Sequence, residues 1–286
     1  MADELDSATE LAGVIPELWS REVHRANYSA AIAPKVAYTE LTDEMKAMGD
    51  IIHLNNFPRL TVNDVTATTG AVANQAVTIA DVSLTIDKWK ECTVEIVDKG
   101  GIQSYMSEES LASKFGAEFG PALAEKSDND LFANYGDLTT NVAGDGTGIM
   151  ADEIVRAGLQ KLDEARIPKS GRSFVLTPKA FWDLFGQDKY LLAYATGLGK
   201  GMQISGPENV PALYGCKWYE TAELTTTGGI SYNLLLHKKC LAMGMQKTIN
   251  LVRFAKIALS RRINGNCLYG TKTFREDHGC QLRTKE

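Results

Sequence analysis

One stretch, residues 107–136, constrains the fold most; it reads SEESLASKFGAEFGPALAEKSDNDLFANYG. Ser107 is a good helix N-cap, and Glu108 and Glu109 stand where the helix dipole favours anions. Apolar residues then recur at helical spacing, at Leu111, Phe115, Phe119, Leu123, Leu131 and Tyr135. Because proline removes a backbone donor, Gly120–Pro121 predicts a bend or a restart. About thirty residues rising ~1.5 Å each give a rod of roughly 45 Å, which predicts an extended protein.

Composition places the chain among ordinary globular proteins. Its 286 residues are long enough for one large or two modest domains. The first residues lack the basic and apolar runs of a signal peptide, and no segment is long enough for a membrane span, so we expect a soluble protein kept inside the cell. A net charge of −6 argues against a dedicated nucleic-acid binder, so contact with DNA should be weak. The odd cysteine count predicts reduced thiols, at Cys92, Cys216, Cys240, Cys267 and Cys280.

The N-terminal third predicts an arm followed by a long β-hairpin. Residues 16–31 have the spacing of a short amphipathic helix, and two β-rich runs follow Gly49. In the second run Val82, Leu84 and Ile86 alternate with polar residues, and Cys92, Val94 and Ile96 resume the same phase. The segment between the runs, 61–80, has no aromatic residue and too little large apolar surface to pack by itself. We therefore expect a hairpin that is buried only at its base and projects at its tip.

The second half has an α/β pattern. A helix should begin at Asp152, and SFVLT (173–177) should form a buried strand. Thr177–Pro178 then provides an N-cap and a first-turn proline for a helix that Gly186 ends. The remaining segments are mostly extended. The pattern predicts helices packed on a sheet.

No motif of catalysis, cofactor binding or metal binding stands out. The glycine-rich segments 144–148 and 197–201 match neither phosphate-binding pattern, and His278-x-Cys280 has no second ligand pair. The four histidines fall in four separate segments. The strongest basic cluster is best interpreted as a solvated face or as ion pairs between subunits; it comprises Arg253, Lys256, Arg261 and Arg262. We predict no catalytic residue, no cofactor and no metal.

The order of these segments resembles the major capsid protein of tailed bacteriophages, the Hong Kong 97-type fold. The resemblance rests on Gly49–Asp50 followed by IIHLNNFPRLTVNDV, on the helix at 107–136, on SFVLTPKAFWDLF, which is similar to a strand-to-helix step of the axial domain, and on CLYGTKTFREDHGCQL, which looks like the closing strand of the peripheral domain. It implies an α+β fold. The implied divisions are an N-terminal arm (1–48), an extended β-hairpin (49–98), a spine helix with peripheral domain (99–148), an axial domain (149–240) and a return to the peripheral domain (241–286).

The resemblance also implies a mechanical function. Copies would assemble through hexamers and pentamers into an icosahedral shell around double-stranded phage DNA, in a virion capsid made in the host cytoplasm. The implied partners are other copies of the chain, a scaffolding protein and a portal acting in trans, weakly contacted DNA and a decoration protein, with no membrane. The charged candidates for contacts between subunits are Arg59, Asp64, Lys88, Lys90, Glu108 and Glu109.

Two other classes stay open. An encapsulin-type nanocompartment has the same fold but packages a cargo protein, so the contents of purified shells would distinguish it. An unrelated α/β enzyme is the less favoured alternative, because the sequence offers no convergent acid, base, nucleophile or metal set.

Overall fold

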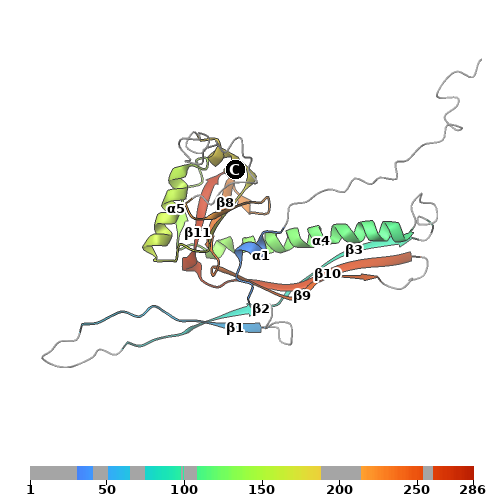
Figure 1. The fold of residues 1–286 in the computed structure, drawn as a ribbon, viewed down its shortest axis with the longest axis horizontal. Coiled ribbons are helices and arrows are strands. Elements are labelled where there is room, and N and C mark those ends of the chain that lie inside the picture. The colour runs from blue at the N-terminus through green and yellow to red at the C-terminus, as the bar shows by residue number, and fades with distance from the viewer. Residues whose placement is uncertain are drawn as a thin grey trace, which may run out of the picture.

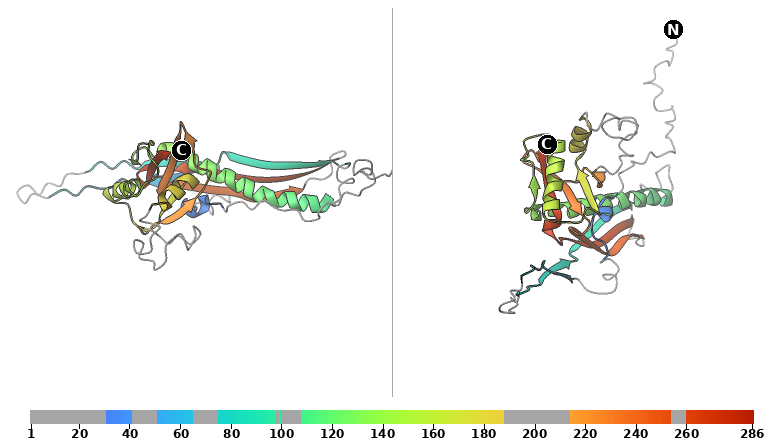
Figure 2. Two further views of the ribbon diagram at one scale, coloured as in Figure 1. Left: turned by 90° about the horizontal axis from the view of Figure 1, so that it is seen from above. Right: turned by 60° about the vertical axis from the view of Figure 1, so that its left-hand side comes forward.

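The computed structural model describes residues 31–40, 51–64, 75–97, 99, 108–187, 214–253 and 260–286, without the side chains of 108–113, 248–253 and 261. Three parts can be distinguished, which we call the wing, the lobe and the projecting hairpin (Figure 1). The hairpin has two limbs beyond its paired strands, the outgoing limb (57–64) and the returning limb (75–79). Seen from above, the wing and these limbs extend in opposite directions from the lobe (Figure 2). The molecule is therefore elongated, as the length of the predicted helix indicated.

The wing is one long helix lying along a narrow sheet. Helix α4 (Glu108–Phe132) covers one face of the antiparallel sheet β3-β10-β9, formed by β3 (Lys88–Val97), β10 (Ser260–Thr273) and β9 (Leu241–Arg253). On β3 every second residue points to the helix, and Phe119 of α4 packs against Ile96 and Ile263. One apolar layer thus joins helix and sheet.

The helix predicted at 107–136 is present as α4, followed by a 3₁₀ turn, η1 (Ala133–Asp137). The sequence predicted a bend or a restart at Gly120–Pro121. The restart is wrong, because α4 continues through Pro121 as one helix, and the bend stays a prediction. A proline forfeits one hydrogen bond of a helix, and packing along the sheet can compensate for that loss.

The lobe is a six-stranded mixed sheet with helices. Its strand order is β4-β11-β8-β5-β6, with β7 paired to β8. The strands are β4 (Val142–Ala143), β5 (Arg172–Leu176), β6 (Lys217–Glu220), β7 (Thr226–Thr227), β8 (Ile230–His237) and β11 (Gly279–Lys285). The predicted helices are α5 (Asp152–Glu164) and α6 (Pro178–Phe185), and the Thr177 hydroxyl accepts the Ala180 N–H as the N-cap.

Both faces of the lobe sheet are covered. Phe174 and Leu176 of β5 pack in one apolar cluster with α5 and α6, whereas Val175 packs in another cluster with the end of α4, including Leu131 and Phe132. A strand buried on both faces is mostly apolar, as Phe174–Leu176 are, although Arg172 and Ser173 at the start of β5 are buried as well. This is why SFVLT could be identified as a buried strand, and all of β5 is indeed buried.

The part of the arm that the structure describes belongs to the core. Helix α1 (Ala33–Val36) packs against α4 and β9, and Ala33 and Val36 are buried. Tyr38 adds a parallel bridge to Ala242 at the start of β9. The helix predicted at 16–31 lies outside the described residues.

Two boundaries differ from the sequence prediction. Strands β1 (Ile51–Asn56) and β2 (Ala80–Thr85) form the predicted hairpin, with Leu84 buried at its base, but β3 pairs with β10 in the wing. The predicted hairpin segment 49–98 is thus divided between two sheets. Likewise, β10 belongs to the wing but β11 lies inside the lobe sheet, so segment 241–286 does not return to one part only. Both corrections arise from pairing between distant strands, which local alternation does not specify.

After β2 the chain leaves the hairpin sheet and enters the wing sheet as β3. This passage depends on a close backbone contact. A Cβ atom at Gly270 of β10 would lie 2.2 Å from the carbonyl oxygen of Thr85. No side chain fits there without moving the backbone that leads from the hairpin into β3. Gly270 therefore permits the hairpin base to cross the wing.

We expect Gly270→Ala to destabilise the chain by about 1–3 kcal/mol, the usual range for overpacking. Urea unfolding of the unassembled subunit would measure this loss. The matched control is Gly120→Ala, where an added Cβ meets nothing within 4 Å, inside α4. It should stabilise the chain by about 0.5–1 kcal/mol because alanine favours helix. Equal effects of the two variants would contradict the assigned role of Gly270.

Candidate functional site

The limbs of the projecting hairpin expose large apolar side chains. On the outgoing limb the exposed fractions are 62% for Phe57, 63% for Leu60 and 95% for Val62. On the returning limb Val77 and Ile79 are about half exposed. Apolar groups gathered on a segment that extends past the lobe are typical of a surface that another molecule covers (Figure 1).

The two limbs are held together by one side chain. The Gln75 side-chain amide accepts the Thr61 N–H at 3.2 Å and donates to the Thr61 carbonyl at 2.8 Å. The amide replaces a pair of ladder hydrogen bonds without burying apolar area. The limbs are therefore paired but uncovered.

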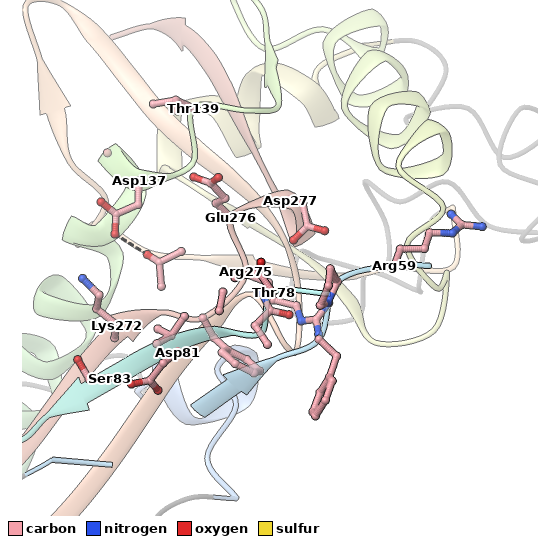
Figure 3. Close-up of a pocket in the computed structure, with 18 residues that line it drawn as sticks. Arg59, Thr78, Asp81, Ser83, Asp137, Thr139, Lys272, Arg275, Glu276 and Asp277 are labelled. Atoms are coloured by element: carbon pink, nitrogen blue, oxygen red, sulfur yellow. Dashed lines mark hydrogen bonds between the residues drawn. The ribbon is translucent and has the colours of Figure 1, made fainter. Parts of the chain in front are cut away.

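A groove lies where the limbs leave the rest of the molecule (Figure 3). Its volume is about 920 Å³, and its lining comes from both limbs, from η1 and from the connection between β10 and β11. Charges of both signs line it, from Arg59, Lys272, Arg275, Asp81, Asp137, Glu276 and Asp277. Small-molecule sites are mostly apolar with few polar groups, so this groove suits a charged protein segment better.

Most acidic groups of the groove have partners within the chain. Asp137 accepts a hydrogen bond from the Thr273 hydroxyl at 2.8 Å, Asp81 lies 2.6 Å from His53 Nδ1, and Asp277 lies 2.9 Å from His278 Nδ1. The exposed Arg59 points away from the other labelled side chains (Figure 3). Arg59 is therefore open to a neighbour.

Behind the hairpin base, charged side chains gather around Asp130 of α4. Lys126 lies 2.7 Å and Lys90 lies 3.9 Å from its carboxylate, and the buried Tyr269 hydroxyl donates to it at 2.9 Å. Lys88 donates to the Asp130 carbonyl at 3.3 Å and to the Thr271 hydroxyl at 2.6 Å. This Asp130 cluster joins α4, β3 and β10.

Electrostatics in the cluster favour the ionised carboxylate. Burial acts to raise the pKa of Asp130, but the hydrogen bonds from Lys126 and Tyr269 and the charge of Lys88 hold it below its usual value. Burial lowers the pKa of Lys88, although the charge of Asp130 opposes this. Burial and the bond to Asp130 raise the pKa of Tyr269, which stays a neutral donor.

The six predicted contact residues fall in three places. Arg59 and Asp64 are exposed on the outgoing limb, whereas Lys88 and Lys90 lie together at Asp130 in their own subunit. Glu108 and Glu109 begin α4, and their side chains lie outside the described residues. Contacts of these six with another subunit stay a prediction.

Sequence reasoning missed two carboxylates, the partly buried Asp130 and the buried Asp128. Asp130 could have been noticed through the i, i+4 spacing to Lys126. Asp128 accepts the backbone N–H groups of Ile32 and Ala33 at 2.7 and 2.9 Å, and it had no such signal because its partners are far away in the sequence.

The described residues contain no group of three or more His, Cys, Asp or Glu side chains that could hold a metal. All five cysteines are unpaired, and burial raises the pKa of the Cys280 thiol to about 12. Within the described part of the chain, no helix is both long and apolar enough to span a membrane.

The Asp130 cluster makes a measurable contribution to folding. We expect Tyr269→Phe to lower the free energy of unfolding by about 1.5–3 kcal/mol, because it removes a buried hydrogen bond to a charged group. Tyr219→Phe is the control: Tyr219 is partly buried in the same core cluster, and its ring lies under the Lys35 ammonium group. It should change stability by less than about 0.5 kcal/mol. Urea unfolding at neutral pH would show whether the two variants differ.

Comparison with solved structures shows the same fold in phage particles. A chain from Mycobacterium phage Che8 has a TM-score of 0.75 at 21% identity, with 94% of this chain and 96% of that chain covered. The capsid of cyanophage P-SCSP1u gives 0.72 at 14%, covering 96% and 94%. The capsid asymmetric unit of cyanophage Pam1 gives 0.72 at 13%, covering 99% and 98%. No family model and no curated protein matches the sequence. The chain thus has the fold of phage capsid structures over nearly its whole length.

Proposed function

We propose that this chain is the major capsid protein of a tailed bacteriophage and has a structural function, without enzymatic activity. Copies assemble through hexamers and pentamers into an icosahedral shell that encloses double-stranded DNA. The fold supports this proposal, since its solved neighbours include phage capsids over nearly the full length of both chains.

The observation that carries the proposal is the uncovered hairpin. Val62 is 95% exposed, and Phe57 and Leu60 nearly two thirds, on limbs that reach past their own lobe. Fully burying a side chain of this size is worth ~1.5–3 kcal/mol. Because the described part of the chain leaves these side chains exposed, the hairpin is suited to lie across a neighbouring copy.

Charge should set the register of that contact. Arg59 at the groove and Asp64 further along the same limb are of opposite sign and exposed. Ion pairs at the rim of an interface mainly steer and orient partners. We assign these two residues to contacts between subunits ahead of Lys88 and Lys90, which already have partners around Asp130.

Other partners follow from the same role. A scaffolding protein and a portal would act in trans, a decoration protein would bind outside, and DNA would be contacted weakly, in line with the net charge of −6. The protein would be made in the host cytoplasm and reside in the virion capsid.

Electron microscopy and sedimentation of the purified chain, alone and with the scaffolding protein of its phage, test the proposal. We expect capsomers or closed shells. A monodisperse monomer under both conditions would overturn the proposal. Shells that package a protein and no DNA during infection would instead assign the chain to the encapsulin-type nanocompartments.

A point variant separates assembly from folding. We expect Val62→Asp to leave the unfolding free energy of the single subunit within ~0.5 kcal/mol, because the position is exposed. Shell yield, measured by sedimentation, should fall by about tenfold or more, since each copy loses more than ~1.4 kcal/mol of interface burial. Val62→Ile keeps the apolar surface and should assemble normally. If Val62→Asp and Val62→Ile assemble equally well, the limb is not an interface.

A further inference from the structure

The lobe and the wing are connected by three chain crossings, at residues 138–141, 237–241 and 273–279, which we call the joint. The crossings are bonded to one another. The Cys240 carbonyl accepts the N–H groups of Phe274 and Arg275 at 2.8 and 3.1 Å. The Asn141 side chain donates to the carbonyls of Asp277 and Gly279 at 3.0 and 3.2 Å. These hydrogen bonds add to the apolar cluster that packs the end of α4 and the start of β9 under the lobe sheet.

Two histidines from different crossings meet in the joint. His237 ends β8, and His278 lies in the 3₁₀ turn η3 (Glu276–His278) between β10 and β11. Their ring centroids are 5.4 Å apart in an edge-to-face arrangement, and both residues are buried. This ring contact joins the crossing from β8 to β9 with the crossing from β10 to β11.

The unprotonated Nδ1 atom of His237 also stabilises the turn that follows β8. The backbone N–H of Lys239 donates to His237 Nδ1 at 3.2 Å, and the His237 carbonyl accepts the N–H of Cys240 at 2.8 Å. A nitrogen that accepts a hydrogen bond cannot carry a proton, whereas both nitrogens of a charged imidazole are donors. Protonation would thus place a donor against the Lys239 N–H.

The surroundings oppose a charge on His237. Burial lowers the pKa of His237, and the charges of His278, Lys239 and Arg172 lower it further, against a smaller opposing effect of the hydrogen bond with the Ser170 backbone. The titratable and charged groups around the pair are Arg172 of β5, Asp163 of α5, Lys169 before β5, Lys238, Lys239 and Cys240 after β8, and Arg275, Glu276 and Asp277 before β11.

Two of the three acidic groups among them, Asp163 and Asp277, have ionic partners other than His237, and Glu276 is exposed. The Asp163 carboxylate pairs with Arg172 at 2.7 Å and lies 3.5 Å from Lys169, and Asp277 pairs with His278 at 2.9 Å. The basic residue Lys238 lies 3.6 Å from Glu40. His237 therefore faces cations without a carboxylate of its own.

We propose that His237 is the proton sensor of an acid-responsive latch in the joint. Neutral His237 accepts from Lys239, packs on His278 and keeps the three crossings bonded. Protonated His237 loses that acceptor and repels its neighbours, which loosens the hydrogen bonds between the crossings while the apolar cluster still holds the lobe on α4. Because the latch lies within one chain, it operates whether or not copies assemble.

The direction of the pH effect follows from linkage. The folded pKa of His237 lies below the ordinary histidine value of about 6.5, so the unfolded or opened chain binds the proton more readily. The contribution to stability is complete above that value. It falls as the pH drops below about 6.5.

Hydrogen exchange of the Phe274 and Arg275 amides tests the latch in the purified full chain. After correction for intrinsic rates, we expect their protection to fall several-fold between about pH 7.5 and about pH 5.5, because the opened chain binds the proton more readily than the closed joint. His237→Gln, whose amide oxygen accepts at any pH, should keep protection within about twofold over the same range. The matched control is His53→Gln, which replaces a histidine paired with Asp81 on the hairpin. In this variant the protection of the Phe274 and Arg275 amides should fall as it does in the wild type.

A second variant keeps the test decisive if His237→Gln loosens the joint at every pH. His278→Gln removes the neighbouring charge, so His237 should protonate more easily. The fall in amide protection should then begin at a higher pH than in the wild type. Three results would each overturn the proposal. The amide protection of the wild type does not change with pH, the protection of His237→Gln falls as that of the wild type does, or the pH midpoint of the fall is unshifted in His278→Gln.

Discussion

The whole structure depends on two carboxylates on one turn of α4. Asp128 accepts the backbone N–H groups of Ile32 and Ala33, and Asp130 binds Lys126 and Tyr269 and lies near Lys88 and Lys90. The arm, β3 and β10 are far apart in the sequence, and all three converge here. Because a buried acceptor without partners costs ~1–3 kcal/mol or more, the helix holds these segments in place as much as they hold the helix.

Rigid attachment of the wing explains how the hairpin can remain uncovered. The core is completed by α4, the two sheets and α1, and the hairpin contributes to it only through its base, at Leu84 and Ile86. Beyond the groove its limbs add exposed apolar area and few internal bonds. The exposed apolar surface of the limbs is thus not needed for the core, so a change there can leave folding intact.

Local sequence patterns predicted the helices and strands that are determined by residues close together in the sequence. The long helix, α5 and the step from β5 through Thr177–Pro178 into α6 follow from spacing and capping in short windows. The division between β2 and β3 could not be seen, because their alternation continues in one phase and only the distant Gly270 shows where the chain crosses. Buried Ala33 and Val36 also gave no signal, since a four-residue helix has no period to recognise. At the site, Arg59 and Asp64 are exposed as a contact role requires, but the bonds of Lys88 come from partners across the sheet.

Acid should act on the parts of this molecule in sequence. The lowered pKa of Asp130 means that its contribution is present above the ordinary aspartate value of about 3.9 and is lost only as the pH falls below it. Burial raises the pKa of Asp128, so protonation of that group does not oppose the folded arm. His237 responds nearer pH 6.5, some two to three units earlier. Mild acid therefore reaches the hydrogen bonds of the joint while the carboxylate of Asp130 still holds α4, β3 and β10 together.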